Sequence, residues 1–164
     1  MRFARMMAGV ALLAVALTVP AVAQDAPAGG NLNRILIGYA PAKSTPFATN
    51  DTAKMCLMYQ RTVYEKGTGS ISLSATLLRD AKSNPETAYV GLAEYRLNLK
   101  ASGLNQPYLT AGGGYGGNKS DGGTGDSLAW MVGAGVEVEK AAFELRCLAD
   151  TRYVTILALA GVRF

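Results

Sequence analysis

The chain contains 164 residues, of which 49% are hydrophobic and 17% charged, and its formal net charge is +4. This length suits a single domain, and the hydrophobic content argues against intrinsic disorder. The sequence has no histidine, which excludes Ser-His and Cys-His nucleophile pairs and any metal site that needs histidine. We therefore expect no enzymatic activity, no metal site and no cofactor.

Residues 1–23 have the three parts of a secretory signal peptide. Arg2 and Arg5 form a basic start, an apolar run follows, and an Ala-Val-Ala sequence ending at Ala23 provides a cleavage site. The apolar run is short for a bilayer span of about 20 residues, so we predict cleavage and export, with a small-residue leader at 24–31. Cleavage removes two arginines and lowers the net charge from +4 to +2, a mild balance that does not indicate nucleic-acid binding.

The remaining chain, residues 32–164, follows the period-2 alternation of half-buried β-strands. In the clearest stretch, 69–80, isoleucine and leucine fall on one face, and serine and threonine on the other. The pattern is weaker in 54–65, because Arg61 shares the apolar face with Val63. In all, the alternation predicts eight strands of about 9–13 residues, at 33–40, 54–65, 69–80, 88–100, 107–117, 128–139, 142–152 and 154–164.

Eight such strands can close into a barrel with the apolar side chains inside, as in a soluble barrel, or outside, as in a membrane barrel. Small residues dominate the polar faces, which suits the crowded interior of an eight-stranded barrel. Strands of about 11 residues tilted by about 40° rise about 28 Å, close to the hydrocarbon thickness of a bilayer. Long connections, including 41–51 and the glycine-rich 118–127, alternate with shorter turns, as in outer-membrane barrels. We therefore predict an all-β, eight-stranded, antiparallel up-and-down transmembrane β-barrel.

The polar faces carry charges of both signs, which we expect to form a structural network of ion pairs in the barrel interior. The residues expected in this network are Arg34, Glu94, Arg96, Glu137, Glu139, Glu144, Arg146, Asp150, Arg152 and Arg163. An alternative use of the same residues is catalysis by carboxylates alone, with Glu137 beside Glu139 or Glu144 beside Asp150. We favour the structural network, because buried charges have few other ways to be compensated.

Four stretches of the sequence carry a family resemblance. They are QPYLTAGGGYGG (106–117), WMVGAGVEVE (130–139), FELRCLADTRY (143–153) and LAGVRF (159–164). With eight expected strands and a signal peptide, the chain resembles the small outer-membrane β-barrels of Gram-negative bacteria, of the OmpA-like and opacity-protein-like type. The resemblance implies insertion by the outer-membrane barrel assembly machinery, which reads the last strand and its terminal aromatic, here Phe164. It also implies a role in envelope integrity or surface contact.

These observations predict a structural or interaction protein of the outer membrane, with surface loops for contact and an interior filled by side chains. We expect a monomer surrounded by outer-membrane lipids, with the loops at 41–53 and 116–127 facing outward and no partner that the sequence identifies. The alternative is a soluble exported barrel, similar to a lipocalin, that binds an apolar ligand. Cys56 and Cys147 fall on opposite faces of strands that are not neighbours, so we expect two free thiols.

Overall fold

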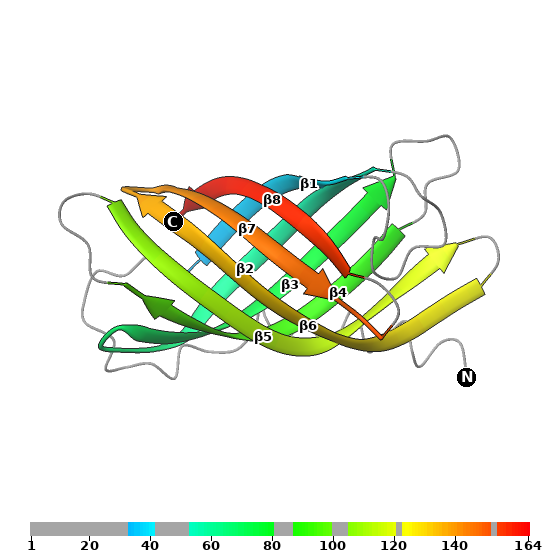
Figure 1. Cartoon of the computed structure of the whole chain (residues 1–164), viewed down its shortest axis with the longest axis horizontal. Coiled ribbons are helices and arrows are strands. Elements are labelled where there is room, and N and C mark those ends of the chain that lie inside the picture. Colours follow the sequence, from blue (N-terminus) through cyan, green and yellow to red (C-terminus); the bar gives the residue numbers. More distant parts are fainter. Residues whose placement is uncertain (1–32, 42–52, 81–86, 100–104, 121–122, 152–153) are drawn as a thin grey trace.

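The computed structural model describes residues 33–41, 53–80, 87–99, 105–120, 123–151 and 154–164. Within these ranges eight strands form a closed barrel, in which each strand is antiparallel to the next and the last closes against the first (Figure 1). The strands are β1 (Asn33–Ala40), β2 (Lys54–Lys66), β3 (Gly69–Asp80), β4 (Thr87–Asn98), β5 (Asn105–Ser120), β6 (Gly123–Val138), β7 (Ala141–Ala149) and β8 (Val154–Arg163). The predicted eight-stranded up-and-down barrel is confirmed. The expected signal peptide at 1–23 and leader at 24–31 lie outside the described residues.

The two ends of the barrel differ. At the end that we call the turn end, β1 begins and β8 finishes, and two-residue turns at 67–68 and 139–140 join neighbouring strands. At the opposite end, the loop end, β1, β3, β5 and β7 finish. The turn end lies at the left of Figure 1, beside the label C. The position of each inward side chain can therefore be described by its distance from the turn end and the loop end.

The wall of the barrel is apolar on its outer surface. In β3, Ser72 and Ser74 are buried in the interior, whereas Ile71 and Leu77 are 42% and 44% exposed on the outside. On other strands Leu128, Leu145 and Ile156 are exposed in the same way. Because side chains alternate across a strand, the period-2 pattern of the sequence sorts residues between the two faces. The membrane-type arrangement, with large apolar residues outward, is therefore confirmed.

A β-bulge in β2 changes the alternation of that strand after Thr62, whereas Arg61 keeps the regular register opposite Leu73. The register between β2 and β3 shifts between Thr62 and Tyr64. An extra residue in one strand moves the following side chains to the other face. Tyr64 therefore continues the outer surface and is 49% exposed, whereas we had expected Val63 in that position.

Strands β5 and β6 are longer than predicted, with 16 residues each. The glycine-rich segment 118–127 was expected to be a loop, but β5 continues to Ser120 and β6 begins at Gly123. Its glycines favoured a loop on composition, yet β4 pairs with β5 as far as Lys119. The ladder with β4 and the hairpin partner β6 hold these residues in extended form, so pairing outweighs the low strand preference of glycine.

The interior of the barrel has an apolar layer that the sequence did not lead us to expect. Its larger members are Leu36, Met58, Leu78, Val90, Leu92, Met131, Leu148, Leu157 and Leu159, all buried. These residues lie between the charged residues of the turn-end half, as Leu36 does relative to Arg34, and further buried charged residues at the loop end, Lys54, Asp80 and Asp150. The interior is thus charged towards the turn end, apolar in a middle layer, and charged again at the loop end.

Candidate functional site: the interior charge cluster

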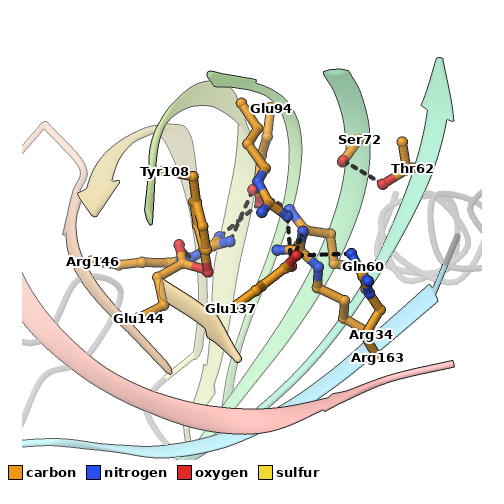
Figure 2. Close-up of polar contacts among 11 residues, drawn as sticks. Arg34, Gln60, Thr62, Ser72, Glu94, Tyr108, Glu137, Glu144, Arg146 and Arg163 are labelled. Atoms are coloured by element: carbon orange, nitrogen blue, oxygen red, sulfur yellow. Dashed lines mark hydrogen bonds and ion pairs between the residues drawn. The ribbon is translucent and has the colours of Figure 1, made fainter. Parts of the chain in front are cut away.

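All eight strands contribute to a cluster of polar side chains in the turn-end half of the interior. Figure 2 shows its central side chains, with Arg146 reaching Glu94 and the arginines gathered around Glu137. We call it the interior cluster, and its members are Arg34, Gln60, Ser74, Glu94, Arg96, Tyr108, Glu137, Glu144, Arg146 and Arg163. Each lies on the inward face of its strand, because its neighbours in the sequence point outward. The cluster divides into two parts.

The first part is built on Arg146 of β7. Its Nη1 and Nη2 atoms donate to Glu94 Oε1 and Oε2 at 2.7 and 2.9 Å, and its Nε donates to Glu144 Oε1 at 2.5 Å. The Tyr108 hydroxyl donates to the other oxygen of Glu144 at 2.9 Å. Glu94 also accepts from Gln60 Nε2 at 2.6 Å and from the Ser74 hydroxyl. One arginine therefore compensates two carboxylates, and neutral donors supply further hydrogen bonds.

The second part is built on Glu137 of β6, which three arginines contact. Arg96 Nη1 lies 2.7 Å from Glu137 Oε1, Arg163 Nη1 lies 2.9 Å from Oε2, and Arg34 also forms an ion pair with Oε1. The Tyr108 ring joins this part to the first, since the guanidinium carbons of Arg96 and Arg34 lie 3.8 and 5.3 Å from its centroid. Such cation–π contacts stabilise positive charge where water is scarce.

Burial determines how much these contacts matter. The side chains of Arg146 and Glu94 are 2% and 0% exposed, whereas that of Arg163 is 32% exposed at the turn end. Removing one partner of a buried ion pair leaves an uncompensated charge and typically costs about 3–5 kcal/mol. The cluster therefore links all eight strands, and removing a single buried partner should strongly destabilise the barrel.

The expected network residues are placed as follows. Arg34, Glu94, Arg96, Glu137, Glu144, Arg146 and Arg163 lie in the interior cluster. Asp150 is buried near the loop end, where its Oδ2 lies 3.5 Å from the Ser127 hydroxyl. Arg152 lies outside the described residues.

The expectation for Glu139 is wrong. This residue lies in the turn after β6, has a φ of 55° and is exposed. The alternation of the strand was extended one step too far, because the chain reverses direction there and no longer presents alternate residues to the interior. Glu139 consequently does not join Glu137 inside the barrel, and the pairing considered for catalysis is absent.

Sequence reasoning missed the neutral members of the cluster. Tyr108, Gln60 and Ser74 hydrogen-bond to the carboxylates, but none of them carries a charge that predicts this contact. The alternation places all three on the inward face of their strands. An uncharged residue that can form hydrogen bonds, on a face that also carries charges, could therefore have been predicted to join the cluster. The two cysteines are free, as expected, with Cys56 buried.

Within the described ranges, no group of three or more His, Cys, Asp or Glu side chains is placed to hold a metal ion. Among the same residues, no helix has the length and apolar character needed to cross a bilayer. The expected assembly residue, Phe164, is 53% exposed on the outer surface, and its backbone N–H donates to Asn33 O at 3.0 Å.

Comparison with known proteins identifies the fold. No protein-family model and no curated protein sequence matches the chain. Among solved structures, Neisserial surface protein A is similar with a TM-score of 0.61 and 15% identity, over 83% of this chain and 99% of that one. The outer membrane protein Ail of Yersinia pestis, in a phospholipid nanodisc, has a TM-score of 0.50 and 18% identity, over 83% and 100%. The outer membrane enzyme PagL has a TM-score of 0.49 and 10% identity, over 78% and 95%. The chain thus has the fold of the small eight-stranded outer-membrane β-barrels.

Proposed function

We propose that the protein spans the outer membrane of a Gram-negative envelope as a closed, side-chain-filled barrel, and that it serves the envelope as a structural or surface-contact protein. The observation that carries this proposal is the combination of an apolar outer wall with a filled interior. The wall suits lipid, and the interior leaves the ends of the barrel as the surfaces available to partners.

The outer wall carries aromatic side chains towards both ends. Tyr95, Phe143 and Phe164 are exposed near the turn end, and Tyr39 and Trp130 are exposed towards the loop end. Two aromatic girdles are typical of membrane barrels, because aromatic rings favour the interface between headgroups and acyl chains. The short turns would then face the periplasm and the loop end the cell exterior.

Lipid contact is further supported by a groove of about 820 Å³ on the outer wall. Ala158 and Ala160 of β8 form part of its lining, together with the larger Tyr39, Phe143 and Leu145 of neighbouring strands. An apolar depression between large side chains suits the acyl chains of outer-membrane lipids. The barrel assembly machinery is a second proposed partner, with Phe164 as part of the recognised strand.

The proposal gives the contact role to the loop end. The long hairpin formed by β5 and β6 reaches it, and the expected contact loop at 41–53 begins there, although residues 42–52 lie outside the described part. In the described part of β6, pairing with β7 starts only at Trp130, so the hairpin extends beyond its neighbour. Such a projection offers backbone and side chains to another molecule without altering the barrel wall.

The interior supports a structural rather than a catalytic use of the carboxylates. Glu94, Glu137 and Glu144 are each held by at least one arginine, and Glu94 and Glu144 also accept hydrogen bonds from neutral side chains. Carboxylates engaged in this way are poorly placed to exchange protons with a substrate. The alternative of a soluble, lipocalin-like barrel is disfavoured, because its apolar residues would have to face inward around a cavity.

Cell fractionation combined with an unheated SDS gel tests the proposal. We expect the protein in the outer-membrane fraction, and we expect its mobility to change on heating, because a closed membrane barrel stays folded in SDS until it is heated. Recovery in the soluble periplasmic fraction, without a heat-dependent shift, would exclude the membrane assignment. Loss of surface contact on shortening of the β5–β6 hairpin, with an unchanged heat shift, would support the role of the loop end.

A further inference from the structure

The two parts of the interior cluster have opposite surpluses of charge. Around Arg146, one arginine compensates the two carboxylates Glu94 and Glu144. Around Glu137, three arginines, Arg34, Arg96 and Arg163, share one carboxylate. The second part therefore holds two positive charges in excess, in surroundings where the side chains of Arg34 and Arg96 are only 6% and 5% exposed.

The sequence offers little negative charge to offset this surplus at the turn end. The last two residues of β2 are Glu65, opposite the buried Ser70, and the exposed Lys66, and the turn after β6 brings Glu139 and Lys140, so each pair adds one acid and one base. The connection from β4 to β5, at 99–104, contains no acid, and Asp25 is the one acid in the segment 24–32 that precedes β1. The charged residues of the turn end therefore leave the excess of positive charge around Glu137 uncompensated.

Hydrogen-bond donors of the same arginines lack partners. Within the described structure, Arg96 Nε and Arg163 Nε are buried atoms without a hydrogen-bond acceptor. In contrast, Nε, Nη1 and Nη2 of Arg146 all donate to carboxylate oxygens. Buried donors are nearly always satisfied, so two unsatisfied guanidinium donors beside an excess of positive charge indicate a missing acceptor.

We propose that Arg34, Arg96 and Arg163, together with Glu137 as their organising carboxylate, form a binding site for a small oxyanion such as inorganic phosphate. Guanidinium groups present paired N–H donors that match the oxygen atoms of phosphate or carboxylate better than a spherical ion. Arg96 and Arg163 bind opposite oxygens of the same carboxylate, so Glu137 holds both guanidinium groups around one point of the interior.

The geometry also defines the direction of entry. Arg163 is the last residue of β8, at the turn end, and its side chain is 32% exposed, so the site opens at the turn end. Towards the loop end, the apolar layer that includes Leu36, Met58 and Leu159 closes the interior. An anion would therefore enter and leave the site at the turn end and would not cross the barrel. This inference does not depend on the surface-contact role proposed above.

Titration of inorganic phosphate into the folded full-length mature chain tests the site. The protein is held in a non-ionic detergent, which contains no phosphate, and binding is followed by the ³¹P line width at constant ionic strength set with chloride. We expect saturable binding by the wild-type protein and at least about a tenfold weaker affinity for Arg163→Gln, because a charge-assisted hydrogen bond to the anion is lost. Arg163→Lys should retain part of the affinity.

Lys140→Gln is the matched control, because it removes the same charge from an exposed residue at the same end. We expect its phosphate affinity to stay within about twofold of the wild-type value, since exposed charges are screened. Equal losses in Lys140→Gln and Arg163→Gln would show general attraction to the positive end and overturn the proposal. Absence of saturable binding by the wild-type protein would also overturn it, since water would then satisfy the free donors. The heat shift of each variant on SDS gels verifies that it is folded before titration.

Discussion

Arg146 and Glu94 are joined by two parallel hydrogen bonds of 2.7 and 2.9 Å, although 52 residues separate them along the chain. They stand on β7 and β4, which are not neighbours in the wall, so the pair bridges the interior of the barrel. Both side chains are almost completely buried. The bridge fixes the distance between two sides of the barrel that backbone hydrogen bonds connect only through other strands.

Replacing Arg146 by leucine should destabilise the barrel strongly. The change leaves Glu94 and Glu144 buried without their shared cation, and we expect a loss of about 3–5 kcal/mol in the free energy of unfolding. Urea unfolding in detergent micelles measures this loss. The double variant Arg146→Leu/Glu94→Leu should recover part of it, because one uncompensated carboxylate is removed. A single variant as stable as the wild-type protein would contradict the importance of the bridge.

The sequence predicts the local features of this structure better than the contacts between distant strands. The faces of β3 followed directly from its alternation, because the backbone period alone decides which side chains point inward. The partners of Arg146 did not follow, because they depend on which residues of distant strands reach the same height in the closed barrel. The bulge before Tyr64 and the turn at Glu139 were missed, since each breaks a pattern that gives no local warning. The inward apolar layer was missed because a period of two does not distinguish an apolar interior from an apolar exterior.

A positive charge on the outer wall should hinder membrane insertion. Leu145 is 61% exposed on the outer face of β7, and Leu145→Arg would place a guanidinium against lipid. The expected destabilisation is about 2–4 kcal/mol near the middle of the bilayer, measured by equilibrium unfolding from phospholipid vesicles. Lys66→Arg, at an exposed turn-end residue, is the control and should unfold like the wild-type protein. Equal stability of the Leu145 variant would argue against lipid contact at that face.

The filled interior should prevent steady ion conduction. The interior cluster blocks the turn-end half, and buried residues such as Met58, Met131 and Leu148 fill the next layer. Eight strands leave an interior only just wide enough for side chains, so we expect no stable open level in planar bilayers. Arg163→Gln should not create one, because it leaves the apolar layer intact. A stable conductance of the wild-type barrel would show that this packing opens in the membrane.

Two adjacent glycines of β5 should respond in opposite ways to a single methyl group. A Cβ atom at Gly114 would lie 1.9 Å from the backbone oxygen of Gly91 on β4, whereas at Gly113 its nearest neighbour is 3.7 Å away. A backbone oxygen cannot move aside without disturbing the ladder between β4 and β5, so Gly114→Ala should cost about 1–3 kcal/mol. Gly113→Ala should be neutral or slightly stabilising, because alanine restricts the unfolded chain more than glycine does. The folded fraction on unheated gels after refolding compares the two variants directly. Similar yields would mean that β4 and β5 approach each other less closely than the register of Gly114 with Leu92 requires.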